Sequence, residues 1–142
     1  SVPMYAKILV PMALDHDLSP QTLAIAKALS AEGAEVVALH VHPELQGSVN
    51  SFLDKDVIKA GHDAAEAKLK EKTASLENVT AVLVTGHPAR AIIDYADSHG
   101  IDCIVIGSHK PGLRDYFLGS TAARVVQHAG CAVHVHRDSD ID

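Results

Sequence analysis

Two glycine-containing steps in the last third of the chain could bind an anion. Gly107 follows an apolar run, and Gly119-Ser120 precedes a helical pattern. A helix amino terminus has unpaired N–H groups and a positive partial charge, and glycine lets the backbone come close, so such steps suit a phosphate. Lys110 and Arg114 lie between the two steps and could add charge-assisted contacts. The pattern therefore indicates a candidate phosphate site.

The same residues also have a purely structural interpretation. Gly107 and Gly119 could serve only tight turns, Ser120 could only cap its helix, and Lys110 and Arg114 could be solvated. The pattern by itself leaves both interpretations open.

Histidines suggest a second kind of site, because the chain has ten of them. His40-x-His42 and His134-x-His136 would each place two imidazoles on one face of a strand. No third Cys, His or carboxylate stands at a recognisable ligand spacing. We therefore expect partly exposed residues at strand ends or at the sheet edge, and we predict no metal ligands.

Sequence signals for catalysis are sparse. No Gly-x-Ser-x-Gly elbow, Walker lysine motif or paired-carboxylate arrangement is present. Ser108 and His109 are adjacent in a loop, where a structural role is favoured over a nucleophile with its base. We predict no catalytic residue.

The elements that would position these residues alternate along the chain. Apolar, β-rich runs predict five strands, at residues 6–12, 34–41, 79–85, 101–106 and 131–137. Caps, breakers and periodicity predict four helices: from Ser19-Pro20 to a stop at Gly33, from Asp54 to about Ser75, from Pro88 to a stop at Gly100, and over 120–128.

The second of these helices is predicted from apolar spacing, because Val57, Ala60, Ala64, Ala67 and Lys68 recur at helical intervals with charges between them. Crossovers too long for hairpins specify a parallel sheet with helices on both faces. Such a sheet binds ligands beyond the carboxyl ends of its strands, where the strand order reverses.

Bulk properties limit the class of protein. A chain of 142 residues with 47% apolar residues and a mean hydropathy of +0.10 predicts one globular domain over residues 1–142. A net charge of −6 argues against a nucleic-acid binder. Neither a membrane-spanning run nor an export signal is present, so we expect no membrane partner and a cytoplasmic location. Cys103 and Cys131 lie in apolar runs and are expected to be small buried side chains.

The glycine steps resemble the nucleotide-binding signature of the universal stress protein family, Gly-x2-Gly-x9-Gly-[Ser/Thr]. Gly107 matches the first glycine and Gly119-Ser120 the last pair. Lys110 stands in place of the second glycine, and eight residues rather than nine separate it from Gly119. The family includes a branch with such a Ser-His-basic-Pro loop that still looks like a nucleotide binder.

The resemblance covers essentially the whole chain. It includes Ile8-Leu9-Val10-Pro11, Leu39-His40-Val41, Gly86-His87-Pro88-Ala89 and the segment 119–129. It implies an α/β, Rossmann-like sandwich of the adenine nucleotide alpha hydrolase-like type, with five parallel strands in the order 3-2-1-4-5. It also implies a homodimer formed by antiparallel pairing of the last strand, residues 131–137, which would bring His134 and His136 near their symmetry mates.

Position by position, the resemblance implies a site for an adenine nucleotide. The base would lie against Pro11, Met12 and Val41, with the backbone of Val41 reading its edge. Ala13 occupies the position where family members usually have an aspartate. The ribose and phosphates would lie beside the remaining residues, which are Gly107, His109, Lys110, Arg114, Gly119, Ser120 and Thr121.

Three functions remain open on this basis. The first is a stress-response regulator that binds ATP, ADP or AMP, with or without magnesium, and hydrolyses ATP slowly or not at all. Occupancy of the site would bias the dimer or a contact with an unknown protein partner. The second is a nucleotide-free interaction module of the same fold, which Lys110 and Ala13 favour. The third is a hydrolase or nucleotidyl-transfer enzyme, for which no nucleophile is seen.

Overall fold

Five parallel strands form one sheet in the order β3-β2-β1-β4-β5, which confirms the expected order. The computed structural model describes residues 4–14, 20–43, 54–107 and 119–137. The strands are β1 (Tyr5–Pro11), β2 (Ser30–Pro43), β3 (Val79–Gly86), β4 (Cys103–Gly107) and β5 (Ala132–His136). The helices are α1 (Pro20–Leu29), α3 (Lys55–Thr73), α4 (Pro88–Ser98) and α5 (Ser120–His128).

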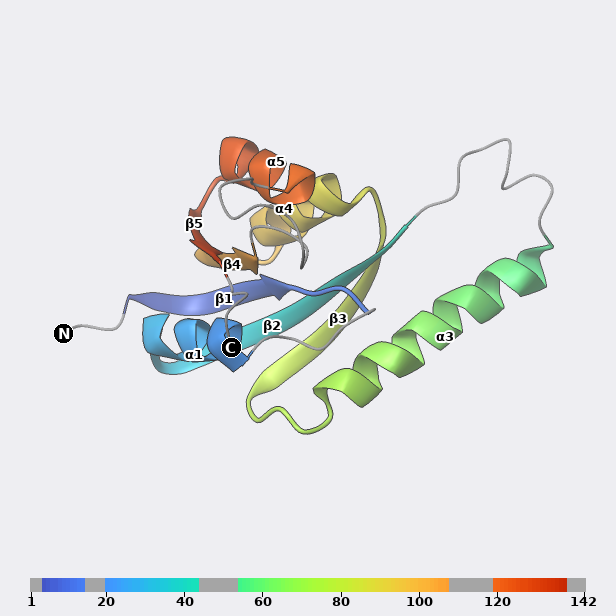
Figure 1. Cartoon of the computed structure of the whole chain (residues 1–142), viewed down its shortest axis with the longest axis horizontal. Helices are drawn as coiled ribbons and strands as arrows, with labels where there is room; N and C mark the ends of the chain where they lie inside the picture. The colour runs from blue at the N-terminus through green and yellow to red at the C-terminus, as the bar shows by residue number, and fades with distance from the viewer. Residues whose placement is uncertain (1–3, 15–19, 44–53, 108–118, 138–142) are drawn as a thin grey trace.

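Both faces of the sheet are covered, which is why the central strands are continuously apolar. Helices α1 and α3 lie on one side of the sheet, and α4 and α5 lie on the other (Figure 1). Along β1, Ile8 and Val10 face α1 while Leu9 faces α4 and α5, and all three side chains are fully buried. Because successive side chains of a strand point to opposite faces of the sheet, β1 contributes residues to a separate core on each face.

The first helix ends earlier than predicted, at Leu29 rather than at Gly33. The Ser30 hydroxyl donates to the Ala26 carbonyl at 2.6 Å, and β2 begins at Ser30. The β1–β2 register then jumps from Tyr5↔Ser30 to Lys7↔Glu35, and Gly33 has a φ of +76° within that irregularity. Gly33 thus lies in a strand bulge. A bulge and a helix end can both require a left-handed backbone conformation, which glycine adopts easily.

The remaining bounds differ by one or two residues. β1 stops at Pro11, so Met12 lies just beyond it. β4 begins at Cys103 and includes Gly107, and β5 is Ala132–His136. Ser19, the predicted cap of the first helix, lies outside the described residues.

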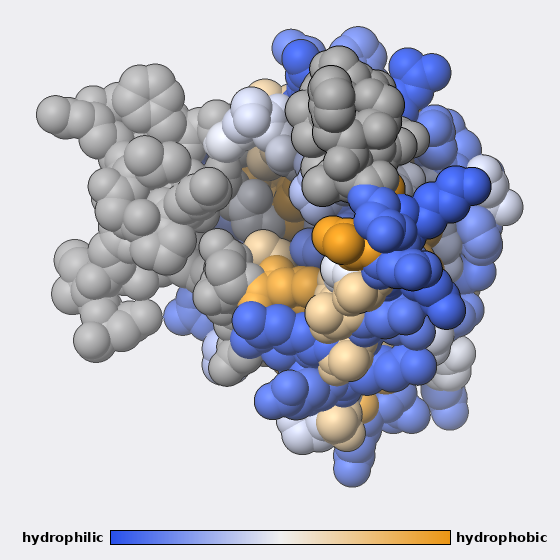
Figure 2. Space-filling model, turned by 90° about the vertical axis from the view of Figure 1, so that its right-hand side faces the viewer, coloured by the Kyte–Doolittle hydropathy of each residue, from blue (hydrophilic) through white to orange (hydrophobic). Residues whose placement is uncertain are grey.

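The apolar stripe that predicted α3 faces away from the sheet. Val57 is 56% exposed, and Ala60, Ala64 and Ala67 are also exposed. The sheet side of α3 instead carries its buried residues Leu69 and Thr73, with Ile58, His62 and Ala65 half-buried. Figure 2 looks onto the side of the molecule where α3 lies in Figure 1 and shows a narrow apolar band between hydrophilic side chains. Helical spacing predicted the helix correctly, but it did not identify the side that packs.

No helix in the described segments combines the length and the apolar character that a membrane span requires.

Candidate functional site

The ends of β1 and β4 form the point where the strand order reverses. β1 pairs with β2 on one side and with β4 on the other, through Ile8↔Cys103 and Leu9↔Ile104. In open parallel sheets, ligands generally bind beyond the carboxyl ends of the strands at such a reversal point. Gly107, the last residue of β4, is exposed at this edge, and a Cβ on it would meet no atom of the described residues within 4 Å.

The amino terminus of α5 supplies donors near the same edge. Gly119 is the N-cap of α5, with φ −60° and ψ 154°. The Gly119 carbonyl accepts from the Ala123 N–H at 2.9 Å, but glycine has no side chain with which to cap the first-turn N–H groups at Ser120 and Thr121. Ile106 and Ala122, which flank the two glycine steps, belong to one buried cluster. The core therefore holds α5 on the α4 side of the sheet, and α5 begins near the carboxyl end of β4 (Figure 1).

Three of the predicted phosphate-site residues, His109, Lys110 and Arg114, lie outside the described residues.

The predicted base-site residues lie at the ends of β1 and β2, but two of their side chains point into the core. Met12 is 8% exposed and packs with Ala38 and Leu69 under α3. Val41 is buried in the cluster on the α4 side. Pro11 is half-buried and Ala13 is exposed. Val41 could therefore contact a ligand through its main chain.

His40 makes a contact at this edge that sequence reasoning missed. Its Nδ1 lies 3.0 Å from the Met12 carbonyl oxygen, and the Met12 N–H donates to the Leu39 carbonyl at 2.8 Å. Both main-chain polar groups of Met12 are therefore occupied. No sequence pattern indicates a contact between Met12 and His40, which are 28 positions apart. A histidine at the end of a predicted strand was the only signal.

The histidines on β2 face α3 rather than forming an evident metal site. His42 and His62 make an edge contact with ring centroids 5.9 Å apart. Burial, and then the neighbouring imidazoles His62 and His40, lower the pKa of His42. Among the described residues, no three His, Cys, Asp or Glu side chains are grouped so as to hold a metal ion. His134 and His136 are half-buried on β5.

Both cysteines are free. Cys103 is buried on β4, and burial raises the pKa of its thiol to about 11. Burial also raises the pKa of the half-buried Cys131. These thiols are therefore poor nucleophiles at neutral pH, in keeping with the expected packing role.

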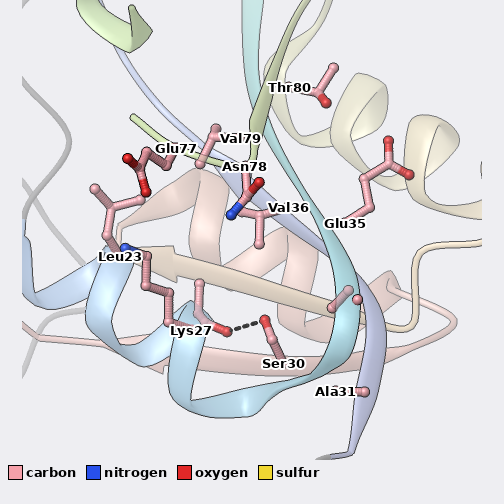
Figure 3. A pocket seen from close by; sticks show the side chains of 13 residues that line it. Leu23, Lys27, Ser30, Ala31, Glu35, Val36, Glu77, Asn78, Val79 and Thr80 are labelled. Carbon is pink, nitrogen blue, oxygen red and sulfur yellow. Dashed lines mark hydrogen bonds between the residues drawn. The ribbon is translucent and has the colours of Figure 1, made fainter. Parts of the chain in front are cut away.

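A groove of about 790 Å³ lies at the opposite edge of the sheet, near the amino ends of β2 and β3 (Figure 3). Its walls come from α1, the irregular start of β2 and the start of β3, and include Lys27, Glu35 and Glu77. It contains none of the predicted site residues. The candidate nucleotide site is therefore separate from this groove.

This strand order, with helices on both faces of the sheet, defines a doubly wound α/β protein. A model of the universal stress protein family matches residues 4–137, and the chain belongs to that family. A universal stress protein of Methanothermobacter thermautotrophicus is 32% identical over 96% of this chain and 98% of that protein. The structure of the hypothetical protein MJ0577 of Methanocaldococcus jannaschii superposes with a TM-score of 0.76 at 30% identity, covering 96% and 99% of the two chains.

Two more distant structures contain nucleotides. A universal stress protein in complex with cAMP is 21% identical, with a TM-score of 0.63 over 95% of this chain and 99% of that one. The universal stress protein of Archaeoglobus fulgidus in complex with dAMP is 23% identical, with a TM-score of 0.55 over 93% and 98%. At these identities the likeness establishes the shared fold.

Proposed function

We propose that this protein binds an adenine nucleotide in the crevice between the carboxyl ends of β1 and β4. The observation that carries the proposal is the amino terminus of α5, whose N-cap Gly119 provides no capping side chain and which lies near the carboxyl end of β4 (Figure 1). Its N–H groups and partial positive charge would receive the phosphates, and the exposed Gly107 leaves space for their approach. Two proteins of the same fold hold adenine nucleotides, so the architecture can accommodate one.

In this arrangement the phosphates and ribose contact Gly119, Ser120, Thr121 and Gly107, and the base lies at Pro11, Met12, Ala13 and Val41. His109, Lys110 and Arg114 would complete the phosphate contacts, with or without magnesium. The ligand is ATP, ADP or AMP, and hydrolysis is slow or absent, because no nucleophile or general base is identified among the predicted site residues.

The biological role that we propose is regulation of a stress response in the cytoplasm by residues 1–142 acting as one domain. Nucleotide occupancy would favour one dimer arrangement or one protein contact over another, which requires unequal affinity for two states. β5 is an edge strand, paired only with β4 within the described sheet. Antiparallel pairing of β5 with a second copy would cover that edge and form the homodimer.

A second candidate is a nucleotide-free interaction module of the same fold. Ala13 favours it, because this exposed position carries a methyl group in place of a carboxylate near the nucleoside.

Analysis of copurified ligand separates the two candidates. The protein is purified without added nucleotide and denatured, and the released small molecules are identified by mass spectrometry. ATP, ADP and AMP are then titrated by calorimetry with and without magnesium. Copurified or micromolar-affinity adenine nucleotide supports the first candidate, whereas no binding at millimolar nucleotide rejects it and supports the second.

A further inference from the structure

The parallel hydrogen-bond ladder between β1 and β2 ends before Met12 pairs with His40. Pairing ends at Pro11↔Leu39, and the Met12 N–H donates to the Leu39 carbonyl at 2.8 Å. In a continued parallel ladder, the next hydrogen bond would run from the Val41 N–H to the Met12 carbonyl. No such bond joins these two described residues.

Val41 nevertheless points its main-chain groups toward that side. Residues of a strand alternate in the side to which their N–H and C=O groups point, so Val41 shares the direction of Leu39, which bonds to the β1 side. β2 is regular here, because its pairing with β3 runs without a shift from Val36 to Pro43. One donor and one acceptor of Val41 thus face the crevice beyond the end of β1.

The His40 imidazole replaces the missing ladder bond. A carbonyl oxygen can only accept, so the 3.0 Å contact requires a proton on Nδ1 of His40. The neutral Nδ1–H tautomer and the imidazolium both meet this requirement, so protonation does not remove the contact. The half-buried ring therefore satisfies the Met12 carbonyl, which would otherwise have the Val41 N–H as its nearest partner in the ladder.

We infer that His40 is a positioning residue: by binding the Met12 carbonyl, it keeps the Val41 N–H and C=O available to a ligand in the crevice. The inference rests on the proposed nucleotide function for the identity of that ligand. A neighbouring donor and acceptor on one residue match the edge of adenine, where the N1 acceptor lies beside the 6-amino donor. His40 would thus act on base recognition without touching the nucleotide.

Two substitutions test this role. His40→Leu removes the donor and puts an apolar side chain in place of the ring, and the Met12 carbonyl is then expected to bond the Val41 N–H. His40→Asn is the matched control, because its amide nitrogen can occupy the place of Nδ1 and donate to the same carbonyl. Both variants are first checked by circular dichroism and thermal unfolding.

The first measurement is amide hydrogen exchange at Val41 in nucleotide-free protein. We expect protection to increase about tenfold or more in His40→Leu and to stay at the wild-type level in His40→Asn, since a ladder hydrogen bond protects its N–H. Unchanged protection in His40→Leu would overturn the inference. This measurement needs no nucleotide, so it remains decisive even if the proposed function fails.

The second measurement compares the affinities for AMP and for 1-deazaadenosine 5′-monophosphate, in which a C–H replaces the N1 acceptor that would pair with the Val41 N–H. Wild type and His40→Asn should bind AMP with about tenfold higher affinity than the analogue, which corresponds to one hydrogen bond. His40→Leu should lose that preference. A merely structural role would weaken both ligands equally, and that result would overturn the inference. If neither ligand binds wild type, the nucleotide proposal is wrong, and the exchange result alone decides whether His40 frees Val41.

Discussion

Lys7 and Asp102 are joined by two hydrogen bonds although they are 95 residues apart in the chain. The Lys7 N–H donates to Asp102 Oδ1 at 3.0 Å, and the Asp102 N–H donates to the Lys7 carbonyl at 3.0 Å. The other carboxylate oxygen of Asp102 accepts from the Ala6 N–H at 2.8 Å. One side chain just before β4 therefore satisfies the N–H groups of the second and third residues of β1 and aligns the two central strands.

Asp102→Ala should lower the free energy of unfolding by about 1–3 kcal/mol, because two part-exposed main-chain donors lose a charged acceptor. Urea unfolding followed by circular dichroism measures the change. Asp94→Ala is the matched control: Asp94 makes an exposed ion pair with Arg90 at 3.8 Å, and its loss should lower the free energy of unfolding by less than about 0.5 kcal/mol. Equal effects of the two changes would contradict a special role for Asp102.

Gly119→Asp should weaken ATP binding through charge while preserving the fold. The φ of −60° at Gly119 suits any residue, and both Asp and Asn are good N-caps. Gly119→Asn therefore keeps the cap and adds no charge, so we expect ATP to bind Gly119→Asp about tenfold more weakly than Gly119→Asn. Calorimetric titration measures the difference.

Adenosine provides the control for the phosphate assignment, because it lacks the group that would lie at α5. It should bind the two Gly119 variants with equal affinity. If ATP also fails to distinguish them, the phosphates lie elsewhere.

Leu69→Ala should destabilise the protein by about 2–5 kcal/mol, because Leu69 is 1% exposed and anchors α3 to the sheet beside Met12. Val57→Ala on the same helix should change stability by less than about 0.5 kcal/mol, since Val57 is 56% exposed. Both values come from chemical denaturation. A large cost at Val57 would mean that a partner, such as a second copy, covers the outer side of α3.

Stability should fall as the pH is lowered below the ordinary histidine value of 6.5, because the folded state lowers the pKa of His42. The unfolded chain then binds more protons than the folded one, so the contribution of His42 is complete above 6.5 and lost as the pH falls toward its lowered value. The groups facing it are His40 on β2 and His62 on α3, with Asp63 3.8 Å from His62.

Urea midpoints between pH 7.5 and 5.5 measure this dependence. His42→Gln should flatten the slope, whereas substitution of the exposed His128 on α5 by glutamine should leave it unchanged. An identical slope in wild type and His42→Gln would exclude His42 as its source.

Local patterns predicted the elements well because their causes are local. Apolar runs predicted each strand, and the Pro88 start of α4 and the Ser120 start of α5 agree with the structure. Resemblance to the family supplied the strand order, which periodicity cannot contain. The early end of α1 was missed because Gly33 suits a left-handed position equally well in a strand bulge and at a helix end.

The sequence by itself determined where strands and helices form and which glycine steps could receive an anion, because these depend on residue type and on spacing within a few positions. Only the tertiary structure decided that α3 packs through Leu69 rather than through its regular apolar stripe, that Asp102 supports β1, and that His40 meets Met12. Those contacts join distant residues through strand register and helix rotation, and both are set by the packing of the whole sheet rather than by any one segment.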